Sequence, residues 1–200
     1  MQLLQWALGS LLVHVVLAAR THCERDLLEA SFDYMPDTWQ LIDTYTSKFH
    51  LMFISKAVLN DEKYKCLTTL RSETVHKHKW TRRMFYCTFP NETTRLTMSS
   101  IVGSRKERTG CSVYDNLITV SDKGETKPEL RSRLLYADYK TCVLLRSKKL
   151  GYQVWAERNH IEKNLEIPYI CVLLYELYAG LAKHWVYDWD ACPRRISNII

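Results

Sequence analysis

The stretch YADYKTCVLLRSKKLGYQVWAE, residues 136–157, decides the fold that the sequence predicts. Two runs rich in branched and aromatic residues flank a turn at residues 149–151, which is the pattern of a β-hairpin. Cys142 lies inside the first strand, and Trp155 lies near the end of the second. Whether Cys142 can form a disulfide depends on the redox compartment of the protein.

The amino terminus predicts secretion. Residues 3–19 are almost entirely apolar, end in small residues that suit cleavage, and are followed by Arg20. This run is shorter than the about 20 apolar residues that span a bilayer. A signal peptide at residues 1–19 is therefore favoured over an uncleaved anchor, although the usual basic residue before the apolar run is missing. The apolar run at residues 167–182 is interrupted by Glu176 and is also too short to span a membrane.

Composition predicts one extracellular domain over residues 20–200. A hydrophobic content of 46% supports a core, and the net charge of +6 suits contact with acidic surfaces without indicating nucleic acid. All seven cysteines follow the predicted cleavage site, which predicts disulfides, with at least one cysteine free, buried or paired with another molecule. The sequon at Asn91 predicts a surface glycosylation site.

The order of predicted elements is helix, eight strands, helix and tail. Helix-type spacing covers residues 23–45 and is split at Pro36, after which Asp37 can cap the second piece. A second helix begins at Pro168 and ends at Gly180. Its predicted apolar stripe consists of Ile170, Leu173, Leu174, Leu177 and Leu181. The strand candidates lie at residues 48–58, 65–78, 79–89, 93–103, 110–122, 129–139, 141–147 and 152–157.

This order predicts a mainly β fold: an eight-stranded antiparallel up-and-down lipocalin barrel with a short N-terminal helix and a C-terminal helix packed outside. Eight strands enclose room for one small ligand. In the run KWTRRMFYCTF, residues 79–89, both faces of the strand are partly apolar. A barrel that holds a ligand produces this kind of imperfect alternation.

Several motifs resemble the tick salivary lipocalins, whose best-known members are the histamine-binding proteins. These are DTW (37–39), DYKTCVLL (138–145), a glycine turn before YQVW (152–155), IP (167–168), a helix that bears a cysteine, and a lone cysteine near the end. The resemblance covers essentially the whole mature chain and rests on the order and spacing of the motifs.

The resemblance implies two disulfides. One joins Cys66 to Cys192, and the other joins Cys142 to Cys171, so that Cys142 points outward and fastens the helix to the barrel wall. Ile170 stands where some relatives have the partner of an N-terminal cysteine, which leaves the pairing of Cys23 open. Cys87 and Cys111 are additional and could bridge neighbouring strands. For Cys87 a buried thiol is an equal alternative.

The resemblance also implies a ligand. Histamine binders neutralise the amine with cavity carboxylates and hold its ring between aromatic side chains, so histamine or serotonin is the first expectation. The family's acidic positions fall on Asp61, Gln153 and Arg133, and one tyrosine position falls on Val58, so most of the amine-binding set is missing. An inward Arg133 would instead suit an anionic lipid mediator such as a leukotriene, whereas an outward Arg133 would simply be solvated. The aromatic candidates for the cavity are Phe53, Phe85 and Trp155, each of which is alternatively a core residue, and Trp39 is expected to be structural.

Other functions have weaker signals. Nucleophile-elbow, zinc-protease and Walker motifs are absent from the sequence, and His76 and His78 on one side of a strand lack a third metal ligand. The basic run KHKWTRR, residues 77–83, suits heparin-like polysaccharide or, more simply, a charged outer face. We therefore expect a secreted, monomeric and non-enzymatic carrier, without cofactor, metal, membrane or nucleic-acid partner, that removes a small host mediator. The alternative is a module that blocks a host defence protein such as complement.

Overall fold

The structure of the chain is a computed structural model that describes residues 25–44, 48–57, 64–88, 95–108, 111–122 and 130–192. The predictions for residues 1–19, Cys23, Val58, Asp61, Asn91 and the side chain of Cys87 lie outside the described part and stay predictions.

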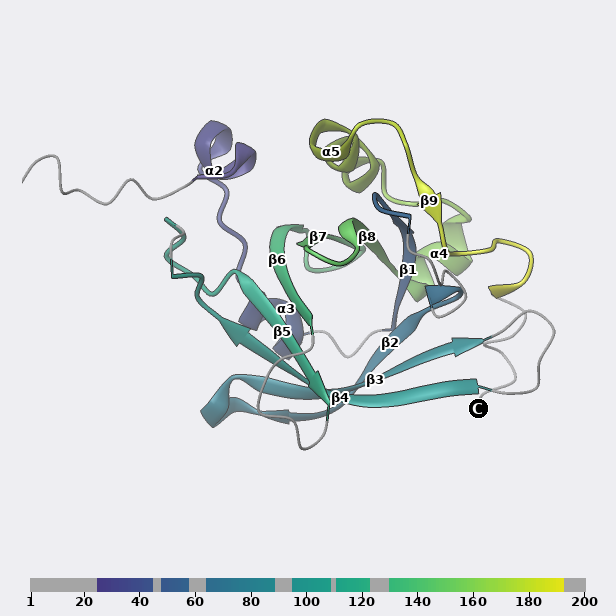
Figure 1. The fold of residues 1–200 in the computed structure, drawn as a ribbon, viewed down its shortest axis with the longest axis horizontal. Helices are drawn as coiled ribbons and strands as arrows, with labels where there is room; N and C mark the ends of the chain where they lie inside the picture. Colours follow the sequence, from purple (N-terminus) through teal and green to yellow (C-terminus); the bar gives the residue numbers. More distant parts are fainter. Residues whose placement is uncertain are drawn as a thin grey trace, which may run out of the picture.

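Eight antiparallel strands close into a barrel, as predicted (Figure 1). The strands are β1 (Phe49–Ile54), β2 (Thr68–Val75), β3 (Trp80–Thr88), β4 (Arg95–Arg105), β5 (Leu117–Asp122), β6 (Leu130–Ala137), β7 (Cys142–Ser147) and β8 (Gly151–Glu157). Each strand from β2 to β8 pairs with its neighbours in sequence, and β1 pairs with both β2 and β8, which closes the sheet. A short β9 (His184–Trp185) pairs with the end of β1. All eight predicted strand positions are confirmed.

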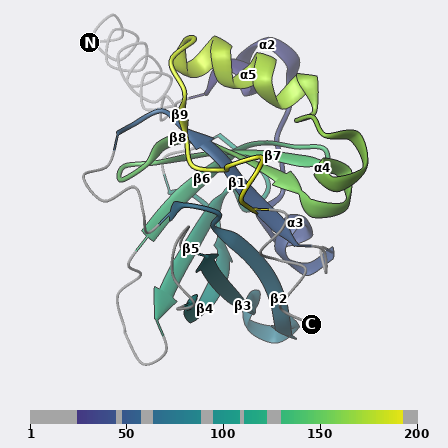
Figure 2. The same cartoon turned by 90° about the vertical axis from the view of Figure 1, so that its right-hand side faces the viewer.

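The helices lie around this barrel (Figure 2). They are α2 (Leu27–Phe32), α3 (Thr38–Thr44), a 3₁₀ turn η2 (His76–His78), α4 (Arg158–Asn164) and α5 (Tyr169–Ala179). The predicted split at Pro36 is confirmed, and the Asp37 carboxylate accepts from the Trp39 backbone N–H at 2.8 Å. The strand predicted at His76 and His78 was wrong, because these residues form the turn between β2 and β3. None of the described helices is long and apolar enough to cross a membrane.

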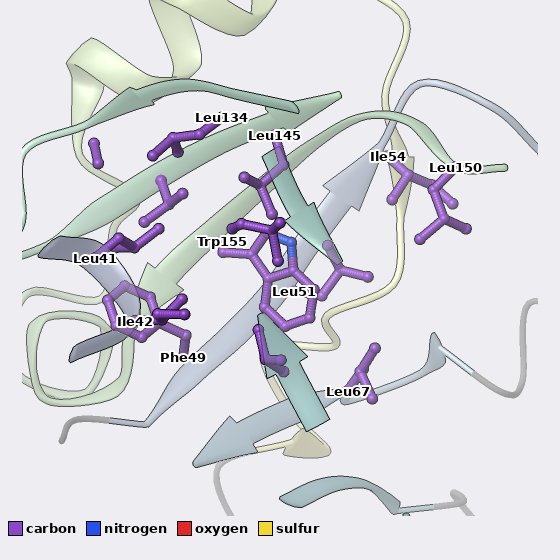
Figure 3. Packing of buried hydrophobic residues seen from close by; sticks show 14 of the residues in the cluster. Leu41, Ile42, Phe49, Leu51, Ile54, Leu67, Leu134, Leu145, Leu150 and Trp155 are labelled. Atoms are coloured by element: carbon purple, nitrogen blue, oxygen red, sulfur yellow. The ribbon is translucent and has the colours of Figure 1, made fainter. Parts of the chain in front are cut away.

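The core has two layers on either side of the barrel wall. The inner layer fills the barrel and includes Leu51, Leu145 and Trp155 (Figure 3). The outer layer lies between the wall and the helix α5 and includes Met52 and Phe53. A bulge between Leu51 and Phe53 shifts the register of β1 against β8, so the alternation of inner and outer side chains is interrupted there.

The buried face of α5 differs from the predicted stripe. Cys171, Leu174 and Tyr175 are buried, whereas Leu177 and Leu181 are 60% and 80% exposed. Tyr175 packs edge-on against Phe53, with ring centroids 4.8 Å apart. The helix is apolar on almost every side, so periodicity could not select the face, and contacts with the barrel select it instead.

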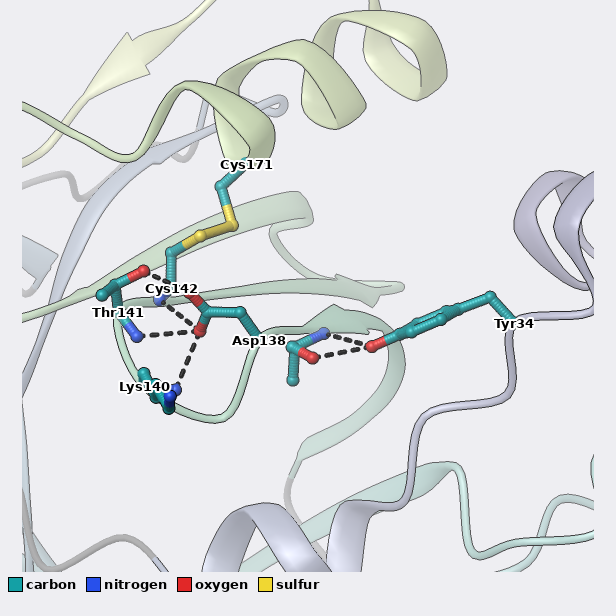
Figure 4. Close-up of a disulfide and its surroundings, with 7 residues drawn as sticks. Tyr34, Asp138, Lys140, Thr141, Cys142 and Cys171 are labelled. Atoms are coloured by element: carbon teal, nitrogen blue, oxygen red, sulfur yellow. Dashed lines mark hydrogen bonds between the residues drawn. A yellow bond between two sulfur atoms is a disulfide. The ribbon is translucent and has the colours of Figure 1, made fainter.

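Both disulfides implied by the family resemblance are present. Cys142 on β7 bonds to Cys171 on α5, with Cα atoms 6.3 Å apart (Figure 4). Cys66 bonds to Cys192, 126 residues away, and closing so long a loop is worth about 5 kcal/mol on the chain-entropy model. Cys111 is also disulfide-bonded. These bridges agree with an extracellular location.

The turn before Cys142 is held by one carboxylate. Asp138 Oδ1 accepts from the backbone N–H groups of Lys140, Thr141 and Cys142 at 2.8–3.0 Å (Figure 4). On the other side of the turn, Tyr34 donates its hydroxyl to the Ala137 carbonyl at 2.7 Å. The family motif around Cys142 therefore positions the start of β7 and, through the disulfide, the helix α5.

Candidate functional site

The barrel contains a half-open cavity whose walls are mostly apolar. Its lining side chains are Leu41 and Ile42 of α3 together with Phe49, Thr69, Arg83, Phe85, Val102, Ile118, Val120, Leu130, Ser132, Val143, Leu145, Gln153 and Trp155 from the strands. The cavity has a volume of about 100 Å³. At about 10–15 Å³ per water molecule, it has room for roughly seven to ten waters or one compact organic molecule.

The helix α3 lies against the barrel beside β3 and β4 and contributes Leu41 and Ile42 to the cavity wall. Figure 3 shows these two side chains beside Phe49, with Trp155 of β8 close by. Two hydrogen bonds fix the start of α3, because the Thr38 hydroxyl lies 2.6 Å from that of Ser104 and 2.9 Å from the Asp115 carbonyl. The sequence pattern did not predict that α3 contributes to the site.

Trp155 is held in place by a polar chain on the same wall. Its indole N–H donates to Gln153 Oε1 at 3.3 Å, and Gln153 Nε2 donates to the Ser147 hydroxyl at 2.9 Å. Both ends of the Gln153 amide are therefore engaged within the protein. Since Gln153 is neutral, it cannot neutralise a ligand ammonium at the position where the family resemblance implies an acid.

Arg83 is the one charged side chain on the described cavity lining, which includes no carboxylate. It is 6% exposed, and its Nε donates to the Thr69 hydroxyl at 3.2 Å. The neighbouring Arg71 is directed to α3, where its guanidinium donates to the Asp43 carbonyl and lies 4.0 Å from the Asp43 carboxylate. Burial, and secondly the charge of Arg71, lowers the pKa of Arg83 to about 10. Arg83 therefore stays cationic at neutral pH.

Three of the predicted binding residues line this cavity, namely Phe85, Gln153 and Trp155. Arg83 and the residues of α3 were missed. The parity of the run at residues 79–89 placed Arg83 on the same face as Phe85, but both faces are partly apolar, so the pattern did not reveal which one is internal.

Phe53 was predicted to line the cavity, and this prediction was wrong, because Phe53 lies in the outer layer of the core. It is fully buried in the outer layer, edge-on to Tyr175 and 5.0 Å from the ring centroid of Trp185. Its place follows from the β-bulge that precedes it.

Arg133 also lies outside the cavity, and it is not simply solvated. Its side chain is 14% exposed and lies 3.2–3.4 Å from the carboxylates of Asp26, Glu29 and Glu107. Asp26 caps α2, and Glu29 lies in its first turn. Arg133 therefore lies on the outer face, as the second expectation placed it, but it is neither a cavity residue nor simply solvated, because its side chain anchors α2 to β6.

His76 and His78 lie in the 3₁₀ turn η2. His76 lies 3.5 Å from the Asp43 carboxylate, and its ring is edge-on to Trp39. Within the described residues, no group of three or more His, Cys, Asp and Glu side chains is arranged to hold a metal ion.

Comparisons with known proteins agree with this architecture. The sequence profile of a family described as tick histamine binding protein matches residues 28–194. A solved structure described as the AM182 serotonin complex aligns with a TM-score of 0.57 and 17% identity, over 79% of this chain and 94% of its own. Japanin from Rhipicephalus appendiculatus, bound to cholesterol, aligns with a TM-score of 0.49 and 17% identity, over 72% and 93% of the two chains. No curated protein matches the sequence. The first alignment shows a shared fold.

Proposed function

Because the chain belongs to the tick histamine-binding protein family, we propose that it binds a small ligand inside the barrel and removes that ligand from solution. Such a protein acts stoichiometrically, so affinity and abundance determine its effect. The apolar walls supply the driving force, at about 25 cal/mol for each Å² of apolar ligand surface that leaves water. The ligand would be a small inflammatory mediator of the host, which agrees with a disulfide-bonded, extracellular protein.

The buried positive charge of Arg83 restricts the charge of the ligand more than any other feature of the cavity. A protonated amine that enters this cavity meets a buried cation, and no carboxylate on the described lining offsets the repulsion. A carboxylate instead gains a charge-assisted hydrogen bond, which a guanidinium can make with two N–H groups. We therefore propose a compact, largely apolar ligand with a carboxylate or another hydrogen-bond acceptor at one end, as in an acidic lipid mediator or an aromatic acid.

A biogenic amine such as histamine or serotonin is the second candidate. Family membership favours it, and so do the aromatic side chains of Phe85 and Trp155 on the lining. This candidate requires a counter-ion, for which the sequence offers Asp61, outside the described residues. Blocking of a host protein such as complement has no observation of this structure in its favour.

Matched ligand pairs separate the two candidates. Isothermal titration calorimetry at neutral pH would compare imidazole-4-acetate with histamine and indole-3-acetate with tryptamine, because each pair keeps the ring and reverses the charge. We expect the acid of each pair to bind more tightly. In Arg83→Met, affinity for the acids should fall roughly 10-fold to 100-fold, the value of one hydrogen bond to a charged group.

The control variant is Arg82→Gln, which removes the adjacent cation, 3.4 Å from Glu73 on β2. It should bind all four ligands like the unaltered protein. Tighter binding of the amines, unaffected by Arg83→Met, would establish the second candidate. If none of the four ligands, nor leukotriene B4, binds at micromolar concentration, the carrier proposal fails.

A further inference from the structure

A second hollow lies on the outer face of the barrel, away from the ligand cavity. This hollow, called the outer cleft below, has a volume of about 550 Å³ and lies over β5, β6, β7 and β8. Its charged lining consists of five cationic side chains and one carboxylate: Lys56, Arg131, Arg133, Arg146, Lys148 and Glu107. Figures 1 and 2 show α2 and α5 on one side of the barrel, next to β6, β7 and β8.

Strand register produces a row of side chains across the floor of this outer cleft. Leu117 on β5 pairs with Arg133 on β6, Arg133 with Arg146 on β7, and Arg146 with Tyr152 on β8. Directly paired residues project from the same face of a sheet, so the two guanidinium groups are neighbours. Like charges in this position repel each other unless each has a partner.

The two arginines differ in their partners. Arg133 has three carboxylates within 3.4 Å, whereas no carboxylate of the described residues pairs with Arg146. Arg146 instead lies over the ring of Tyr152, 5.6 Å from its centroid, and this ring stacks on Tyr178 of α5. A guanidinium that stacks on a ring keeps its N–H groups available at its edge. Arg146 is thus held in place by Tyr152, and none of the described residues accepts a hydrogen bond from its guanidinium.

The rim of the cleft is also fixed by the fold. Lys56 Nζ donates to the Lys148 carbonyl at 3.0 Å, which ties the end of β1 to the β7–β8 turn. Gly151 in that turn has φ +70°, and a Cβ there would lie 2.1 Å from the Ser55 hydroxyl. Only glycine permits this close approach. The exposed Arg131 completes the cationic set and makes no ion pair within the described residues.

The spacing of these cations determines the class of ligand. They come from β6, β7, the β7–β8 turn and the end of β1, and β6 and β1 are three strand positions apart in the sheet. At about 4.8 Å between strands, the set spans roughly 14 Å. One sulfate or phosphate group is far smaller than that, and the flat surface of a bilayer does not enter a concave cleft. A flexible chain with repeated anionic groups fits both the span and the depth.

We propose that this outer cleft binds a sulfated polysaccharide of the heparan sulfate class. The sulfates would be bound by the free guanidinium edges of Arg146 and Arg131 and by the two lysines of the rim. The site differs from the basic run at residues 77–83, because Arg83 of that run points into the barrel and Arg82 lies beside Glu73. Binding of a small ligand inside the barrel and binding of a polysaccharide outside it would be separate functions, on opposite sides of the barrel wall.

Titration with a heparin-derived hexasaccharide in physiological salt tests the proposal. The double variant Arg131→Gln/Arg146→Gln should bind it about tenfold more weakly than the unaltered protein. The control Lys77→Gln/Lys163→Gln removes the same net charge from exposed residues away from the cleft and should bind within about threefold of the unaltered protein. The fully desulfated hexasaccharide should not bind, and both variants should keep the thermal midpoint of the unaltered protein.

Several results would overturn the proposal. These are no binding of the hexasaccharide at micromolar concentration, an equal loss in both variants, tighter binding to phosphatidylserine vesicles, or tighter binding to single-stranded DNA. Because the altered residues do not line the barrel cavity, a failure here leaves the carrier proposal intact, and a failed carrier proposal does not alter these expectations.

Discussion

Two arginines on the same barrel, the buried Arg83 and the largely buried Arg133, have opposite environments. Arg133 lies outside the wall between β6 and α2, with three carboxylates within 3.4 Å. Arg83 lies inside, beside one hydroxyl, and no carboxylate shares its described lining. A paired buried charge holds a structure together, whereas an unpaired one costs stability and is available to a ligand. This difference identifies Arg133 as the residue that anchors α2 and Arg83 as the candidate ligand-binding residue.

The largest effect is expected at the paired arginine. Arg133→Met leaves the carboxylates of Asp26 and Glu29 without their cation, and Glu29 is only 2% exposed. Breaking a buried ion pair from one side typically costs 3–5 kcal/mol, so we expect the free energy of unfolding to fall by about 4 kcal/mol. Urea denaturation measures it, with Arg131→Met as the exposed control on the same strand. A loss below about 1 kcal/mol would mean that Arg133 does not anchor α2.

A third basic group, His50, is also buried, and none of the described residues gives it an oppositely charged partner. It is 1% exposed, its Nδ1 lies 2.8 Å from the Thr68 hydroxyl, and burial lowers its pKa to about 3. The unfolded chain takes up a proton below about pH 6.5, whereas folded His50 stays neutral until about pH 3. The stability that His50 contributes is therefore present above pH 6.5 and is lost as the pH falls through this window.

The measurement is the free energy of unfolding at pH 7 and pH 4. At 1.36 kcal/mol for each unit of pKa, the unaltered protein should lose about 3 kcal/mol more than His50→Asn between these two values. The exposed His184→Asn serves as the control and should behave like the unaltered protein. Parallel losses in all three proteins would show that His50 is protonated in the folded state.

Replacing Arg83 should raise the free energy of unfolding, whereas replacing Arg133 should lower it. Arg83→Met removes a cation whose pKa is lowered to about 10 by burial. Replacing such a group with an apolar side chain of similar volume often stabilises a protein by 1–4 kcal/mol, so we expect a gain of about 2 kcal/mol in urea denaturation. If Arg83→Met destabilises the protein as Arg133→Met does, Arg83 has a structural partner and the contrast between the two arginines disappears.

The sequence predicted the positions of the strands better than the orientation of the side chains and of α5. Branched and aromatic runs separated by turn residues located all eight strands, because these signals are local. The shift of Phe53 to the outer face depends on a one-residue bulge, and the rotation of α5 depends on its contacts with Phe53 and Cys142, so neither could be deduced from periodicity. α4 was also missed, although Glu157 accepts from the His160 backbone N–H as its N-terminal cap.

The candidate site was predicted only in part for a related reason. Phe85, Gln153 and Trp155 lie on the cavity as expected, but a strand that is partly apolar on both faces does not disclose which charge is internal. The sequence therefore suggested Arg133 as the arginine that selects an anion. In the structure, carboxylates from α2 and its cap neutralise Arg133, and the arginine that points inward is Arg83. Charge pairing between distant segments decides such questions, and it becomes visible only in three dimensions.

The smallest expected effect concerns the charge of the cavity itself. Gln153→Glu restores an acid where the family resemblance implies one and can still accept from the Trp155 indole N–H, although it loses the hydrogen bond that Gln153 Nε2 donates to Ser147. The added carboxylate offsets the field of Arg83, so the preference for indole-3-acetate over tryptamine should fall about tenfold, which corresponds to about 1.4 kcal/mol. Gln153→Met, which loses the same hydrogen bond without adding charge, is the control and should keep the preference. An unchanged preference in Gln153→Glu would mean that the charge of the lining does not select the ligand.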